Sequence, residues 1–79
     1  MNEYEHYAML VQEIDICLTV REYYTNELKD YDIEVACGRI QYNEDIVDTL
    51  SKKKLEAHKK YIHKKHERIR LAKKIFEKL

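Results

Sequence analysis

Apolar side chains recur every three or four residues from Glu3 to about Ala36, which is the spacing of one face of an α-helix. The main stripe has Arg21 as its polar interruption and is formed by Tyr4, Tyr7, Val11, Ile14, Leu18, Thr25 and Leu28. A parallel column widens this stripe and consists of Leu10, Cys17, Tyr24 and Tyr31. The pattern predicts a helix over about residues 3–36 that packs through this broad stripe.

A second apolar group lies on another side of the same predicted helix, roughly 140° from the stripe. It consists of Met9, Ile16, Val20 and Tyr23. One partner helix cannot cover both sides, and Met and aromatic side chains are enriched in protein interfaces. We therefore predict a partner interface at these four residues, covered either by a second copy in a dimeric four-helix bundle or by a different protein.

The segment between the two helical patterns contains Gly38, the only glycine of the chain. Cys37 and Gly38 are typical of a helix end, and Asn43 can cap a following helix, which gives a connection over about residues 37–43. A second interpretation stays open because apolar residues also alternate between residues 30 and 42, at Ile33, Val35, Ile40 and Tyr42. That alternation would fit a small β-hairpin about Gly38.

From Ile46 onward the helical spacing returns and predicts a helix over about residues 44–79. One edge of its apolar sector is formed by Leu55, Ile62, Ile69, Ala72, Phe76 and Leu79. The other edge is formed by Leu50, Ala57, Tyr61, Leu71 and Ile75. Four polar residues fall inside the sector, namely Lys54, His58, Lys65 and Arg68. Two helices of nearly equal length predict an all-α, coiled-coil-like antiparallel hairpin, with residues 1–79 forming a single domain.

The net charge of zero conceals two oppositely charged halves. Residues 1–50 carry 3 basic and 12 acidic side chains, whereas residues 51–79 carry 12 basic and 3 acidic ones. An antiparallel hairpin places the halves side by side, so we expect part of this division to be neutralised internally. Seven basic residues on the outer face of the second helix are predicted to contact phosphates or an acidic protein: Lys52, Lys59, Lys60, His63, Arg70, Lys73 and Lys74. A solvated face without a partner is the alternative interpretation.

Other residue types with chemical potential are sparse. His63, His66 and Glu67 share one helical face, but no further ligand is evident and the neighbouring lysines would repel a cation, so we expect no metal. Ser51 has no oriented His–Asp pair in view, and Cys17 lies on the packing stripe, so we expect neither catalysis nor a cofactor. Five tyrosines are expected at the core or its rim with their hydroxyls in water: Tyr4, Tyr7, Tyr24, Tyr31 and Tyr61.

The sequence also restricts the cellular setting. Its acidic beginning lacks the apolar segment of a secretory signal, and no apolar run approaches the roughly 20 residues of a membrane span, so we expect a cytoplasmic protein. The composition, rich in Lys, Ile, Tyr and Glu, is compatible with an AT-rich bacterial, phage or mobile-element source. These patterns predict a small helical adaptor or inhibitor that binds another protein. A nucleic-acid-binding protein that uses the basic face and a structural subunit of a helical assembly are the two alternatives.

Overall fold

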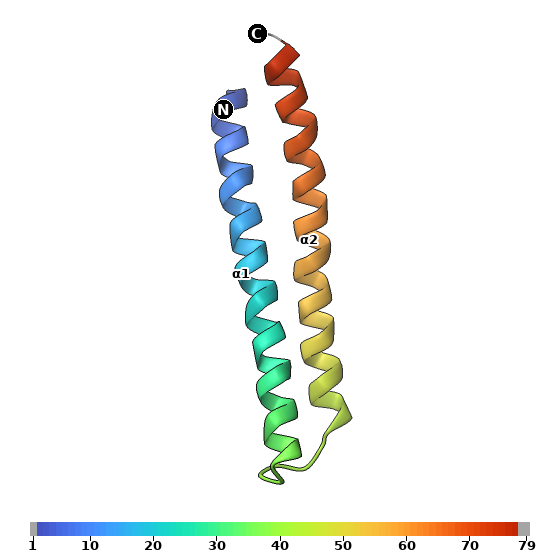
Figure 1. Cartoon of the computed structure of the whole chain (residues 1–79). Helices are drawn as coiled ribbons and strands as arrows, with labels where there is room; N and C mark the ends of the chain where they lie inside the picture. Colours follow the sequence, from blue (N-terminus) through green and yellow to red (C-terminus); the bar gives the residue numbers. More distant parts are fainter. Residues whose placement is uncertain (1, 78–79) are drawn as a thin grey trace.

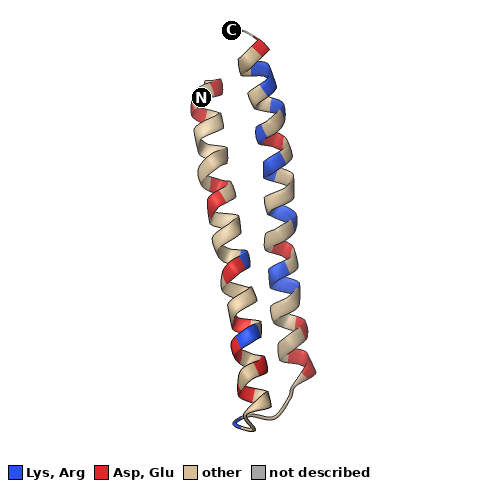
Figure 2. Ribbon diagram, in the orientation of Figure 1, with Lys and Arg blue, Asp and Glu red and all other residues tan. Residues whose placement is uncertain are grey.

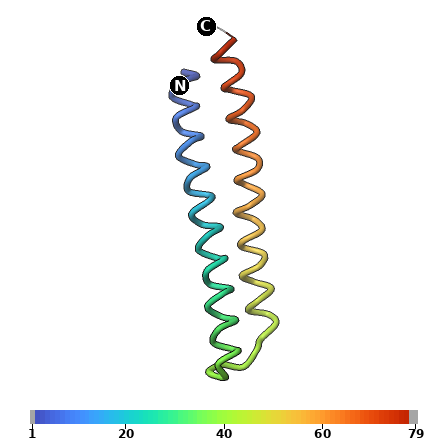
Figure 3. Tube along the Cα trace, viewed as in Figure 1, coloured from blue at the N-terminus to red at the C-terminus, as the bar shows by residue number. Residues whose placement is uncertain are grey.

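The protein is a hairpin of two long antiparallel helices. The computed structural model describes residues 2–77, in which α1 spans Glu3–Ala36 and α2 spans Glu44–Glu77 (Figure 1). The two helices lie side by side along their length, so the start of α1 and the end of α2 lie at the same end of the molecule (Figure 3). The molecule measures 60 × 18 × 15 Å. The predicted all-α hairpin is confirmed, although the helix end expected at residue 79 lies outside the described residues.

Local hydrogen bonds define the connection between the helices. The N–H of Cys37 donates to the carbonyl of Ile33, and Gly38 follows with a φ of +73°, a left-handed conformation that glycine adopts without strain. At the start of α2, the side-chain oxygen of Asn43 accepts from the N–H of Asp45 at 3.0 Å. The predicted helix end at Gly38 and the predicted Asn43 cap are therefore confirmed. The alternative β-hairpin is wrong, because α1 continues to Ala36 and residues 2–77 contain no strand.

Replacing Gly38 with alanine should lower the free energy of unfolding by about 1 kcal/mol, because an L-residue pays a steric penalty at positive φ. A Cβ at this position would meet no heavy atom within 4 Å, so the loss would come from the backbone conformation alone. Urea unfolding followed by circular dichroism measures the change. Gly38→Asn is the matched control, and its loss should be smaller because asparagine tolerates the left-handed region. Equal losses for the two variants would contradict this explanation.

The Tyr31 side chain fastens the connection to α1. Its hydroxyl accepts from the N–H of Asn43 at 2.6 Å and lies 3.3 Å from the carbonyl oxygen of Gln41, while its ring is buried. The Tyr42 ring lies near it, with 6.4 Å between the ring centroids. The ring of Tyr31 lies in the core, as expected, and its hydroxyl bonds backbone groups of the connection, which the sequence did not predict. The connection returns over the end of α1, which brings its backbone groups within hydrogen-bond distance of this hydroxyl.

The packed stripe on α1 is centred differently from the prediction. The buried apolar side chains are Leu10, Ile14, Cys17, Tyr31, Ala57 and Ile75. Three of these belong to the column that was expected only to widen the stripe, whereas Tyr4 and Val11 of the main stripe are exposed. Fewer side chains are buried than predicted because α2 is a single helix and contacts only one narrow stripe of α1. That stripe alternates between the two columns at heptad spacing, as from Leu10 to Ile14 to Cys17.

Helix α2 likewise packs through only one edge of its predicted apolar sector. The edge that faces α1 is buried or half-buried and consists of Leu50, Ala57, Tyr61, Leu71 and Ile75. The other edge is largely exposed, with Leu55, Ile62, Ile69 and Phe76 on the surface. The two-helix hairpin therefore leaves apolar side chains uncovered on both of its helices.

The polar interruptions of the two stripes meet near the middle of the hairpin. Nη1 of Arg21 donates to Nδ1 of His58 at 3.0 Å, and the guanidinium carbon of Arg21 lies 5.2 Å from the centre of the Tyr61 ring. An arginine can only donate, so Nδ1 of His58 accepts this hydrogen bond and carries no proton. Among the described residues, no buried polar side-chain atom lacks a partner. The hairpin thus accommodates two polar groups at its seam by pairing them with each other.

Candidate interaction surfaces

A single ion pair joins the acidic and basic halves across the described part of the hairpin. Nζ of Lys64 lies 2.6 Å from Oε2 of Glu13, and both side chains are less than two-fifths exposed. The hydrogen bond to Glu13 raises the pKa of the Lys64 ammonium above its ordinary 10.5, while partial burial opposes that change. Negative charge on Glu67 adds to the increase in pKa. Direct ion pairs between α1 and α2 therefore neutralise few of the acidic side chains on α1 and the basic side chains on α2 that Figure 2 shows.

Glu13→Gln and Lys64→Gln, combined in a double-mutant cycle, should give a coupling free energy of about 0.2–1 kcal/mol, because the pair is partly solvated. The Lys64 pKa is higher in the folded chain than in the unfolded one, so its stabilising contribution is complete below pH 10.5 and disappears as the pH rises through the raised pKa. The coupling should therefore be constant between about pH 7 and about pH 10 and vanish at higher pH. Urea unfolding of the four proteins at each pH measures it. A coupling that persisted in strong alkali would contradict the assignment to this pair.

The four residues predicted as a partner interface lie together on α1 and are exposed. We call them the Met9 surface, and it comprises Met9, Ile16, Val20 and Tyr23. Between 39% and 62% of each residue's surface is accessible to solvent, although each side chain is apolar or aromatic. The Tyr23 ring packs edge-on against that of Tyr24, with centroids 5.1 Å apart, which holds it on the surface of the helix. The Met9 surface is thus an apolar area that α2 leaves uncovered.

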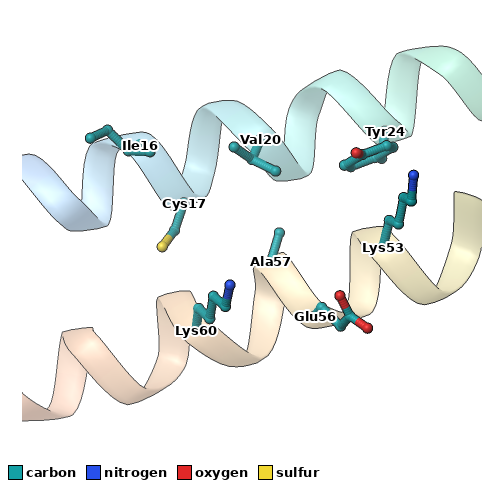
Figure 4. Close-up of a pocket in the computed structure, with 8 residues that line it drawn as sticks. All are labelled: Ile16, Cys17, Val20, Tyr24, Lys53, Glu56, Ala57 and Lys60. Carbon is teal, nitrogen blue, oxygen red and sulfur yellow. The ribbon is translucent and has the colours of Figure 1, made fainter.

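Part of the Met9 surface continues into a groove between the helices. We call it the Ile16 groove, and its lining includes Ile16, Val20 and Tyr24 from α1 and Lys53, Glu56 and Lys60 from α2 (Figure 4). Its charged lining residues are therefore two lysines and one glutamate. Its volume is about 320 Å³. The Lys53 ammonium lies 5.8 Å from the centre of the Tyr24 ring, at the margin of a favourable cation–π contact.

Cys17 and Ala57 point across the gap between the helices and form the floor of the groove (Figure 4). From the sequence alone, the apolar group on α1 and the basic residues of α2 are predicted to form separate surfaces. The structure joins them at Lys60. Lys53 and Lys60 are seven residues apart and flank the same side of Ala57, but that spacing becomes informative only once Ala57 is known to face α1.

The predicted basic residues are all exposed, but they do not share one surface. Lys59, His63 and Arg70 line a shallow depression on the outside of α2, whereas Lys60 lines the Ile16 groove. The remaining three, Lys52, Lys73 and Lys74, are also exposed. Within residues 2–77, none of the seven forms an ion pair with an acidic side chain. Their charges are therefore available to a partner, although a straight phosphate backbone would meet only some of them.

Sites of other kinds are absent from residues 2–77 or are single residues. No group of three or more His, Cys, Asp or Glu residues between positions 2 and 77 is arranged to hold a metal ion, and the set at His63, His66 and Glu67 is no exception. Neither α1 nor α2, as described, has an apolar stretch of the length that a bilayer crossing needs. Cys17 is buried, as expected for a packing residue, and Cys37 is exposed beside the connection.

Three comparisons with known proteins were made, and no family, curated protein or solved structure matches this chain.

Proposed function

We propose that this protein is a small helical adaptor or inhibitor that binds another protein through the Ile16 groove and the Met9 surface. One observation carries the proposal: exposed Ile16 and Val20 lie in the same groove as the ammonium groups of Lys53 and Lys60. Apolar area supplies binding free energy, and charges at its margin select the partner. A hairpin of this size has little else with which to act, because its small core serves mainly to hold the two helices together.

The chemistry of the groove defines the partner. An amphipathic helix would place its apolar face on Ile16, Val20 and Tyr23, in the helix-in-groove mode of recognition. Carboxylates on the margin of that helix would meet Lys53 and Lys60. The partner is therefore a protein segment with apolar residues at helical spacing and acidic residues along one side.

A photo-crosslinking residue placed at position 16 tests the proposal in nuclease-treated extract of the native host. The adduct should form at position 16 and be absent when the same residue replaces Lys29, an exposed position that lies about 140° around α1 from Ile16. With the captured partner purified, Ile16→Asp should weaken its affinity at least about 10-fold, because it places a carboxylate in an apolar contact. Equal capture at positions 29 and 16, or no effect of Ile16→Asp, would refute the proposal.

A nucleic-acid-binding protein is the second candidate, supported by the cations of α2 that form no ion pair with an acidic side chain among residues 2–77. Lys52, Lys59 and Lys73 are spaced by seven or fourteen residues and so lie along one line on the outside of the helix. Three or four phosphate contacts predict that affinity for a generic DNA duplex falls about 40–150-fold between about 50 and 200 mM salt. Fluorescence anisotropy at both salt concentrations measures it. Absence of binding at the lower concentration would exclude this function.

A further inference from the structure

A second apolar area, distinct from the Met9 surface, runs along the opposite side of the hairpin. We call it the Ile62 flank, and it consists of Tyr4, Val11, Leu55, Ile62, Ile69 and Phe76, which are between 36% and 68% exposed. Tyr4 and Phe76 line one pocket together, although they come from opposite ends of the chain. Leu55 lines another pocket with Thr25 of α1, which lies two heptads after Val11. Apolar stripes of α1 and α2 therefore adjoin on this side.

On each helix, the residues of the flank have the spacing of a packing seam, but no helix packs against them in the hairpin. On α2, Leu55, Ile62, Ile69 and Phe76 repeat every seven residues, with His58 and Lys65 between them. On α1, the corresponding positions after Val11 are Asp15, Leu18 and Glu22. Both helices thus carry the three-and-four spacing with which helices pack in bundles. The α1 seam is interrupted by acidic residues and the α2 seam by basic ones.

We propose that the Ile62 flank binds a second copy of this chain and forms a four-helix bundle whose two-fold axis runs parallel to the helices. Two identical flanks can stack in two symmetric ways. An axis perpendicular to the helices would place α1 on α1 and α2 on α2, which brings like charges together (Figure 2). An axis parallel to the helices places the acidic α1 of each copy on the basic α2 of the other, so the charge pattern selects this arrangement.

The register of the dimer follows from contacts inside the hairpin. Pairing of Arg21 with His58, and of Glu13 with Lys64, shows which levels of α1 and α2 coincide. An axis parallel to the helices keeps every residue at its own level. Asp15 of one copy therefore lies near the level of Lys65 of the other, and the two have opposite charges.

The side of the hairpin that carries the flank is large enough for an interface of standard size. The whole side of the hairpin that carries the flank is 60 Å long and at least 15 Å wide, or roughly 900 Å², which is comparable to the roughly 800 Å² per partner of a standard specific interface. The Met9 surface suits self-association less well, because its apolar residues all lie on α1. In a bundle of the same symmetry, Ile16 of one copy would lie on the lysine-bearing side of α2 of the other, where Lys53 and Lys60 line the groove.

Sedimentation equilibrium over a range of protein concentrations tests the dimer. The wild type should have twice the chain mass of 9.7 kDa, and Ile62→Asp should raise the dissociation constant at least about 100-fold while circular dichroism shows that the helices persist. Ile16→Asp is the matched control on the opposite side, and it should leave the dimer intact. A monomeric wild type at about 100 μM, or dissociation by Ile16→Asp instead of Ile62→Asp, would overturn the proposal. Partner capture at position 16 is a separate measurement, so the proposed function and the dimer can fail independently.

A charge exchange tests the arrangement of the helices within the dimer. Asp15→Lys and Lys65→Asp should each weaken the dimer about 3–10-fold, and the double variant should restore most of the wild-type affinity. Restoration requires α1 of one copy to lie on α2 of the other. If the single variants weaken the dimer and the double variant weakens it further, the parallel-axis arrangement is wrong.

Discussion

Leu10→Ala should lower the free energy of unfolding by about 2–5 kcal/mol, because it opens a cavity at the most deeply buried side chain of the hairpin. Leu10 is 1% exposed and is the only large side chain described as fully buried. A small domain without disulfides has a total stability of similar size, so we expect this variant to be largely unfolded at low protein concentration. Urea titration followed by circular dichroism measures the loss.

Gln12→Ala is the matched control for this prediction, since Gln12 is exposed two residues further along the same helix. Its stability should stay within about 0.5 kcal/mol of the wild type. All proteins are to be compared at one concentration, because self-association adds to apparent stability by mass action. A loss below about 1 kcal/mol for Leu10→Ala would contradict the placement of Leu10 at the centre of the packed stripe.

Tyr31→Ala should be of comparable severity, with a loss of about 3–5 kcal/mol, because it removes a buried ring together with the anchor of the connection. Tyr31→Phe retains the ring and removes only the hydroxyl, so it should cost about 1 kcal/mol. The difference separates packing from hydrogen bonding. Urea unfolding gives both losses, and amide hydrogen exchange should be faster at Asn43 in both variants. Equal losses in the two variants, or unchanged exchange at Asn43, would refute this division of roles.

The ends of the helices were predictable because they depend on local interactions. Gly38 can adopt a positive φ without strain, and the Asn43 side chain reaches an N–H group two residues away. Both effects follow from residue type and position alone. The Met9 surface was predictable for a similar reason, since helical spacing by itself separates its residues from the packed stripe.

The surfaces that combine both helices required the tertiary structure. Lys60 belongs to the same groove as Ile16 and Val20 because Ala57 faces α1, and nothing within α2 distinguishes that rotation from one that buries Leu55 or Ile62. The same rotation of α2 leaves the Ile62 flank exposed. Its α2 residues were predicted to form one edge of the packed sector. Only the position of α1 in the structure shows that α1 does not contact this edge and leaves it exposed.

The sequence by itself determined that the chain forms two long helices and which residues share a face, because these properties depend on neighbours within a few positions. Between residues 30 and 42 it left a helix end and a small β-hairpin open, and the structure decided for the helix, which continues to Ala36. The tertiary structure decided which of two adjacent apolar columns is buried, and it paired Arg21 with His58 and Glu13 with Lys64. Adjacent columns on a helix are similar in hydropathy and differ by a small rotation, so their free energies of burial are nearly equal in isolation. When both helices pack together, the column whose side chains fit the facing helix gains the lower free energy and becomes the buried one.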